Sequence, residues 1–317
     1  MNCEIKKVAC VGILVADVMT APTKTGYPVP GELKRTDAIT VHNGGNAMTA
    51  SINLTKMGVK ASIIGKVGDD MFGVYLKDCL ARGGVDLRGL RTDFETQTSA
   101  SVVLLDASGE RAFLHCVGTN ATFCIDDVDF SVVEECDLVF VTGTFLLDRF
   151  DGKETVEFLK KCKAMGKTTF LDVCWDAKGR WGELINDALP YVDYFMPSID
   201  EAVCIADGAE DPDEIADIFT SRGATNIVIK LGGKGSYLRK ACETRGTVYP
   251  AKGGVVAVDT TGAGDSFCSG FLAAYARGAS PEECMLVANA TGALCVTCKG
   301  ATTGTRSYEE TIKFLNE

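Results

Sequence analysis

The sequence predicts an α/β fold, because short apolar runs typical of buried strands alternate with longer segments typical of helices. The strand-like runs are Val8–Val15, Ala61–Val67, Leu138–Val141, Thr168–Val173, Tyr194–Met196 and Ile227–Leu231. The helix-like stretches include Asn46–Met57, Asp151–Met165 and Pro212–Ser221. This order favours βαβ units, and therefore a mostly parallel sheet with helices on both faces.

Two segments interrupt the alternation. Tyr27–Val41 and Thr98–Val117 resemble short strands with turns between them, and the second contains the turn signal Ser108-Gly109. Strands joined by tight turns form antiparallel ribbons. We therefore expect one domain over residues 1–317, with segments at about 18–43 and 97–120 forming a small β appendage. Such an appendage is either a lid that closes over a site or a surface hairpin, and the pattern leaves both open.

Composition excludes some classes of function and location. The 317 residues carry 32 Lys+Arg against 43 Asp+Glu, a formal net charge of -11, which argues against a nucleic-acid partner. The 14 cysteines are scattered singly, as in proteins of the reducing cytosol. The pair Cys295 and Cys298 has too few histidines nearby for a zinc site. Since no apolar stretch is long enough to span a bilayer, we expect a cytoplasmic protein without a membrane partner.

The segment Asp259-Thr260-Thr261-Gly262-Ala263-Gly264-Asp265-Ser266-Phe267 has the strongest chemical signal. Two glycines around a small residue allow a tight turn and a close approach to a ligand. An apolar stripe at Phe267, Phe271 and Tyr275 indicates that a helix follows. Unpaired amides at such a helix N-terminus bind anions.

Asp265 lies in the first turn of this expected helix. It could be a capping carboxylate, or a base that accepts a proton from an attacking hydroxyl beside the anion site. Physical chemistry alone does not favour the catalytic base over the capping carboxylate. Other catalytic motifs are missing: the sequence has no GxxxxGK[ST], no GxGxxG after its first strand and no GxSxG, which disfavours P-loop, dehydrogenase and hydrolase chemistry.

Several motifs together resemble the PfkB/ribokinase family of carbohydrate kinases. Asp259 to Asp265 resembles its C-terminal signature, and Gly44-Gly45-Asn46-Ala47 resembles its N-terminal one. Gly65-Lys66-Val67-Gly68-Asp69-Asp70 matches the stretch that follows the first signature, and Pro30-Gly31-Glu32 resembles the lid segment before it. These matches occur in the family's order and span nearly the whole chain.

The resemblance implies a ribokinase-like three-layer α/β/α core with a small β-sheet lid that often clasps a dimer. It also implies ATP and Mg²⁺, with K⁺ in many relatives. Carried over by position, Asp265 is the catalytic base, and the amides of Gly262, Ala263 and Gly264 form the anion hole. The remaining positions fall into three groups: Asp17, Gly44, Gly45 and Asn46 for the acceptor; Gly232, Gly235, Asn289, Lys299 and Gly300 for the nucleotide; Glu201 for Mg²⁺ through water, with Asp259 and Thr261 for K⁺.

Four positions depart from the family pattern. Ser198 replaces the asparagine of an NxxE motif that retains Glu201, and Thr49 stands where an asparagine is common. Cys174 and Asp176 break an Asp-x-Asn-x-Arg pattern. The lost positive charge argues against an acidic acceptor such as keto-deoxygluconate.

We therefore expect transfer of the ATP γ-phosphoryl group to a hydroxyl of a small neutral sugar. A nucleoside kinase is the nearest alternative, with Phe113 and His115 lining a slot for the base. A sugar-phosphate kinase would need a basic cluster, for which Lys34, Arg35 and Arg111 are candidates. A sugar-binding regulator that has lost catalysis is the alternative from another class.

Overall fold

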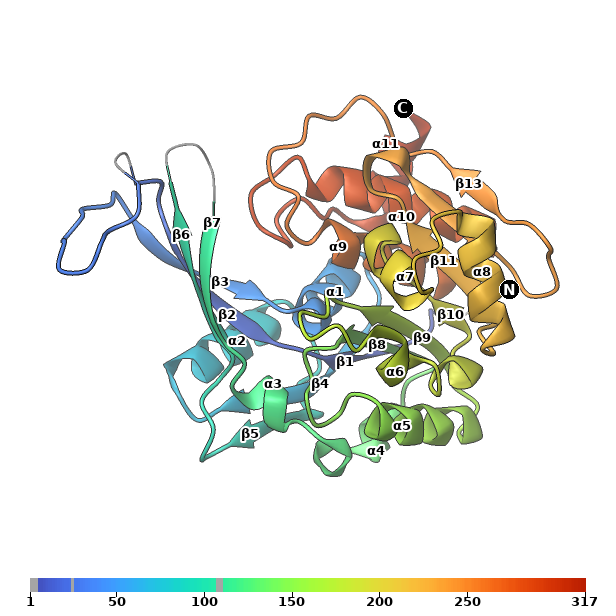
Figure 1. Ribbon diagram of the computed structural model, residues 1–317, viewed down its shortest axis with the longest axis horizontal. Helices are drawn as coiled ribbons and strands as arrows, with labels where there is room; N and C mark the ends of the chain where they lie inside the picture. The colour runs from blue at the N-terminus through green and yellow to red at the C-terminus, as the bar shows by residue number, and fades with distance from the viewer. Residues whose placement is uncertain (1–4, 24–25, 107–110) are drawn as a thin grey trace.

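The computed structural model describes residues 5–23, 26–106 and 111–317, and two sheets organise them (Figure 1). The large sheet has the strand order β13-β12-β11-β10-β9-β8-β1-β4-β5. Its strands from β11 to β5 run parallel, while β12 and β13 are antiparallel additions at one edge. Their bounds are β1 (Val8–Gly12), β4 (Ala61–Gly68), β5 (Leu90–Asp93), β8 (Leu138–Thr144), β9 (Thr168–Val173), β10 (Tyr194–Phe195), β11 (Asn226–Lys230), β12 (Ser236–Arg239) and β13 (Thr247–Tyr249).

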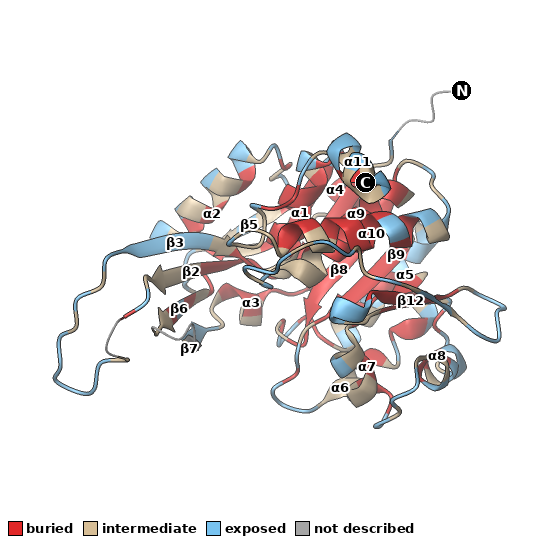
Figure 2. Ribbon diagram, turned by 90° about the horizontal axis from the view of Figure 1, so that it is seen from above, coloured by how far each residue is buried: buried red, intermediate tan, exposed pale blue. Residues whose placement is uncertain are grey.

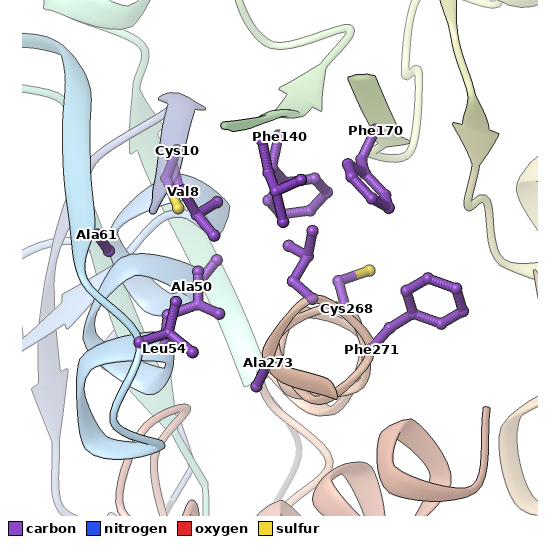
Figure 3. Packing of buried hydrophobic residues seen from close by; sticks show 14 of the residues in the cluster. Val8, Cys10, Ala50, Leu54, Ala61, Phe140, Phe170, Cys268, Phe271 and Ala273 are labelled. Carbon is purple, nitrogen blue, oxygen red and sulfur yellow. The ribbon is translucent and has the colours of Figure 1, made fainter. Parts of the chain in front are cut away.

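Helices cover both faces of the large sheet, because its strands are apolar on both sides. The ribbon coloured by burial shows the central strands of the large sheet as buried (Figure 2). In β1, Val8 and Cys10 contribute to one core (Figure 3), while Ala9 and Val11 contribute to the other. The first core includes side chains of α1 (Asn46–Lys56), α2 (Met71–Arg82), α9 (Ala263–Tyr275), α10 (Pro281–Cys295) and α11 (Tyr308–Asn316). The second includes those of α4 (Phe130–Glu134), α5 (Lys153–Ala164), α6 (Trp181–Ile185), α7 (Ile199–Ile205) and α8 (Pro212–Ser221).

This arrangement confirms the predicted α/β class. Short elements complete the main chain: α3 (Thr119–Thr122) and 3₁₀ turns at Ile125–Asp127, Leu189–Tyr191 and Gly232–Lys234. Among the described helices, none is both long and apolar enough to cross a bilayer.

The predicted first strand, Val8–Val15, is wrong as one element. The chain leaves the large sheet after Gly12 and enters the small sheet at Val15, as β2 (Val15–Thr20). Asn120 occupies the break: its Oδ1 accepts from the amide of Leu14 at 3.2 Å, and its Nδ2 donates to the carbonyl of Leu14 at 3.0 Å. A buried side chain from a distant segment therefore replaces strand pairing here, which the local apolar pattern could not indicate.

The small sheet has the order β3-β2-β6-β7, with β3 at Ile39–Gly44, β6 at Ala100–Leu105 and β7 at Arg111–Cys116. β2 pairs antiparallel with β3 and parallel with β6, and β6–β7 is the predicted antiparallel ribbon. Strand over most of Tyr27–Val41 is wrong, because β3 begins only at Ile39. Pro28 and Pro30 lack the amide that a strand ladder needs. The predicted turn Ser108-Gly109 lies outside the described residues.

The small sheet has one apolar face that remains exposed. Val41 and Val102 are both paired with Val18, and Leu114 is paired with Val102, so the four side chains share that face. Ile39 is the next residue of β3 on the same face, two positions before Val41. Ile39 is 66% exposed and Leu114 is 70% exposed. Contiguous exposed apolar faces of this kind often mark surfaces that another molecule covers.

Candidate active site

The candidate site lies beyond the carboxyl ends of the parallel strands, where open α/β sheets bind their ligands. Asp172 is near the end of β9, and Lys230 is the last residue of β11. Asn46 begins α1, and Asp265 lies in the first turn of α9. Four elements that are distant in the sequence thus place polar side chains at one edge of the sheet.

Asp265 accepts a hydrogen bond from Nδ2 of Asn46 to its Oδ1 at 2.7 Å. The pKa of Asp265 is raised to about 7, by burial first and then by the nearby Asp172 carboxylate, against the opposing effects of Lys230 and Asn46. A carboxyl with a pKa near neutrality is suited to accept a proton at physiological pH. Asp265 is not the N-cap of α9: Gly262 occupies that position, without a side-chain cap. Asn46 is the first residue of α1, and Gly45 occupies the N-cap position before it.

The turn before α9 needs glycine. Gly262 has φ 75°, and a Cβ on it would lie 2.4 Å from Cβ of Ala301. The loop at residues 299–301 therefore packs directly against the turn. Asp259 ties the two together, since its Oδ2 accepts from the amide of Gly300 at 3.1 Å and its Oδ1 accepts from Oγ1 of Thr261 at 2.7 Å.

The predicted acceptor-binding residues are also brought together. A Cβ on Gly44 would lie 2.2 Å from Oδ2 of Asp17, and one on Gly45 would lie 2.5 Å from the carbonyl oxygen of Ile13. Only glycines let the Asp17 carboxylate and the β1–β2 break approach this backbone. Asp17 itself lies in β2, in the small sheet.

Asp17 is part of a polar row across the small sheet. It is paired with His42 on one side and with Ser101 on the other, and Ser101 is paired with His115. Oγ of Ser101 and Nδ1 of His115 are 3.1 Å apart. Burial raises the pKa of Asp17, while the hydrogen bond from Ser101 and the two imidazoles act in the opposite direction.

The thiol of Cys174 orients the side-chain amide of Asn46. Its Sγ donates to Oδ1 of Asn46 at 3.2 Å, which leaves Nδ2 of Asn46 to donate to Asp265. Burial and neighbouring carboxylates hold the pKa of the Cys174 thiol well above its ordinary value, so the thiol stays protonated as a donor. The sequence indicated Cys174 only as a departure from a family pattern.

Sequence reasoning missed Lys230. Its Nζ lies 2.5 Å from Oδ1 of Asp172, and their side chains are 12% and 1% exposed. Burial would lower the pKa of Lys230, but the Asp172 carboxylate holds it above its ordinary value, so the lysine is charged. The available signal was a lysine at the end of the apolar strand Asn226–Lys230, immediately before a glycine turn.

Glu201 and Ser198 form a capping box at the start of α7. Oε2 of Glu201 accepts from the amide of Ser198 at 2.7 Å, and Oγ of Ser198 accepts from the amide of Glu201 at 3.4 Å. In the described part of the chain, no group of three acidic, histidine or cysteine side chains could hold a metal ion by itself. Mg²⁺ usually keeps several waters and is bound by one or two carboxylates with substrate phosphates. The carboxylate of Glu201 is available for such a role, since it lies near enough to Asp265 to raise the pKa of that residue.

Three of the predicted nucleotide-binding residues lie around the end of β13: Gly232, Gly235 and Asn289. Gly235, at φ 105°, packs against Tyr249, where a Cβ would lie 2.0 Å from the carbonyl oxygen. Asn289 donates to the carbonyl oxygens of Tyr249 and Pro250 at 3.1 and 3.2 Å. Gly232 begins the turn that Gly235 closes, through a hydrogen bond of 3.0 Å. Lys299 is exposed in the loop that carries Gly300.

Comparisons with known proteins agree with this architecture. The chain is 29% identical over 289 residues to a fructokinase of Vibrio alginolyticus, which covers 86% of this chain and 92% of that protein. It is 28% identical over 284 residues to the aminoimidazole riboside kinase of Salmonella typhimurium, covering 86% and 88%.

A solved structure shows the same fold. The ribokinase of Arabidopsis thaliana, complexed with ribose and ATP, superposes with a TM-score of 0.85 at 24% identity, covering 99% of this chain and 100% of that one. The family model described as pfkB family carbohydrate kinase matches residues 5–307. With the glycine turn, Asp265 and the two-sheet architecture in place, this match shows that the chain belongs to the PfkB family of carbohydrate kinases.

Proposed function

We propose that this kinase transfers the γ-phosphoryl group of ATP to a hydroxyl of a small neutral sugar, with Asp265 as the base. The observation that carries the proposal is the position of Asp265. It lies at the N-terminus of α9, is held by Asn46 at 2.7 Å and has a pKa raised to about 7. A proton acceptor and an anion site in the same helical turn are what transfer to a hydroxyl requires.

Each group of residues has one task in this proposal. Asp17 and the Gly44–Asn46 turn orient the acceptor hydroxyls, and Asp265 receives the proton of the attacking one. The amides of Gly262, Ala263 and Gly264 stabilise negative charge on the transferring phosphoryl oxygens. Glu201 would hold Mg²⁺ through water, and Mg²⁺ when bound would neutralise phosphate charge. Asp259 and Thr261 are the residues that would border a K⁺ ion.

The small sheet completes the site as a lid. Its polar row, with Asp17 and Ser101, continues from the glycine turn that leads into Asn46. Closure of this sheet over the acceptor would exclude water, which otherwise competes as a phosphoryl acceptor. The exposed apolar face of the same sheet would pair with a second copy of the chain in a homodimer.

A neutral acceptor is favoured by the surroundings of Asp176. This residue stands where the resemblance leads to an arginine, and it is buried and paired with Arg180 at 3.0 Å. Arg180 also donates to the carbonyl oxygen of Phe145 at 3.0 Å, so the guanidinium group is engaged by protein groups on two loops. The fructokinase relative, as named, acts on a neutral sugar.

Two alternative acceptors have weaker support. A nucleoside is favoured by the riboside kinase relative and by Phe113, which is 61% exposed on the same face of the small sheet as His115. A sugar phosphate has less support, because Lys34 already donates to the carbonyl oxygens of Gly26 and Tyr27. The side chain of Arg111 lies outside the described part.

The test is ADP release from Mg·ATP, with and without K⁺, against pentoses, hexoses, sugar acids, sugar phosphates and nucleosides. We expect turnover with a neutral sugar and a loss of at least about 10²-fold in kcat for Asp265→Asn. Turnover only with nucleosides would replace the acceptor class. Binding of a sugar without any turnover would contradict catalysis and support a regulator.

A further inference from the structure

We infer that Lys230 is a further catalytic residue, whose ammonium group contacts the phosphoryl group during its transfer. The inference rests on the proposed function, because it assigns Lys230 a role in the same phosphoryl transfer. It would provide a full positive charge beside the amides that begin α9.

The first argument is the location of the ammonium group. A Cβ built on Gly264 would lie 3.7 Å from Nζ of Lys230, so the ammonium lies against the second residue of α9. The stem of Lys230 is enclosed by the protein, and its Nζ is held by Asp172 at 2.5 Å. The lysine is therefore positioned in advance, at small further cost in conformational entropy.

The second argument is the charge of the site. Three carboxylates lie close enough to affect one another: besides burial, Asp172 and Glu201 raise the pKa of Asp265, whereas Lys230 lowers it. ATP adds further negative charge, of which Mg²⁺ when bound would neutralise only part. A helix N-terminus supplies only about half an elementary charge, which leaves an excess of negative charge where the phosphoryl group must come. Lys230 offsets part of that excess at the required position.

The third argument is that the ion pair has little structural justification. A buried ion pair is often no more stabilising than an apolar pair of similar size, although removing one partner is strongly destabilising. An ammonium group has three donors, and the bond to Asp172 uses one of them. The others can reach oxygens of an anion at the start of α9. Removing one preorganised donor that stabilises developing negative charge typically lowers the rate by about 10²–10³-fold, and we expect an effect of this size for Lys230.

The experiment changes Lys230 with and without its partner Asp172, so that an effect on catalysis can be told apart from an effect on stability. Lys230→Met alone leaves Asp172 buried and unpaired, so we expect a large fall in the thermal unfolding midpoint. Lys230→Met with Asp172→Asn removes both charges, and we expect the midpoint to return to within a few degrees of wild type. In this double variant kcat should still be lower by about 10²-fold, with the acceptor KM nearly unchanged.

A binding measurement supplies a readout independent of turnover. Calorimetry would compare Mg·ADP alone with Mg·ADP plus aluminium fluoride and acceptor, which imitates the transferring phosphoryl group. The double variant should bind Mg·ADP as wild type does and bind the fluoride complex about 10²-fold more weakly. The matched control is Lys163→Met with Asp193→Asn, a surface ion pair of 2.7 Å that the site does not include. It should behave as wild type in both assays.

Two results would overturn the inference. One is a stable double variant whose kcat is within threefold of wild type; the other is an equal loss of affinity for Mg·ADP with and without fluoride. Inactive wild-type protein would instead contradict the proposed function. The two failures are therefore distinguishable.

Discussion

Nδ2 of Asn46 and Oδ1 of Asp265 lie 2.7 Å apart, across 219 positions of sequence. The bond joins the first residue of α1 to the first turn of α9 and fixes the orientation of the Asp265 carboxylate. Because an amide donor stabilises the ionised form, it also moderates the rise in pKa that burial causes. The two family signatures therefore meet in one hydrogen bond.

The first prediction concerns pH. A base must be deprotonated, and the pKa of Asp265 is raised to about 7, so kcat/KM should fall about tenfold per pH unit below pH 7 and reach a plateau above it. Asn46→Leu removes a donor to the carboxylate and should move the midpoint to higher pH. Steady-state profiles from pH 5.5 to 9 would measure this. A flat profile between pH 6 and 8 would exclude Asp265 as the titrating base.

The second prediction concerns stability. Because the folded-state pKa of Asp265 is raised, the ionised carboxylate destabilises the fold, progressively from about pH 4 to 7 and fully above that range. Asp265→Asn removes the charge and should raise the free energy of unfolding by on the order of 2 kcal/mol at pH 8. At pH 4 the difference should vanish. Urea titrations at both pH values test this, and equal stability at pH 8 would contradict the assigned pKa.

The third prediction concerns Cys174. Its thiol donates to Oδ1 of Asn46 at 3.2 Å, so Cys174→Ala removes the group that orients the amide. We expect kcat to fall about three- to tenfold, since roughly 1 kcal/mol of hydrogen bonding is lost. Cys174→Ser keeps a donor and should restore most of the activity. A loss in both variants that follows their thermal stability would instead indicate a packing role.

The fourth prediction concerns Gly44. A methyl group there would lie 2.2 Å from Oδ2 of Asp17, so Gly44→Ala must displace that carboxylate. We expect the acceptor KM to rise at least tenfold while the KM for ATP is unchanged. The control is Gly253→Ala, where a Cβ would meet nothing within 4 Å. Equal effects on both KM values would place Asp17 outside the acceptor site.

The fifth prediction concerns assembly. Val102 and Leu114 are 39% and 70% exposed on the apolar face of the small sheet. Introducing lysine at both positions should convert the proposed dimer into a monomer, because charged groups would have to be buried at the interface. Light scattering would measure the mass. Val248→Lys, which changes an exposed apolar residue in β13, should leave it unaltered.

The sequence alone was enough to predict the fold class and the segment from Asp259 to Phe267 that contains the proposed base. Strand and helix periodicities are properties of adjacent residues, so β9 and α8 have the predicted bounds. The glycine turn before α9 could likewise be predicted from the sequence, because its backbone conformation depends on the residues within the turn. The motif matches then indicated the family, which the comparison over residues 5–307 shows.

Tertiary structure decided the contacts between distant segments. Asn120 divides the first apolar run between two sheets, and Cys174 supports Asn46; neither contact is encoded by local spacing. The pairing of Lys230 with Asp172 follows from the placement of β11 and β9 on either side of β10. The physical reason is that side-chain periodicity specifies which face of an element is apolar. The polar groups that meet at the ends of the elements depend on how the whole sheet assembles.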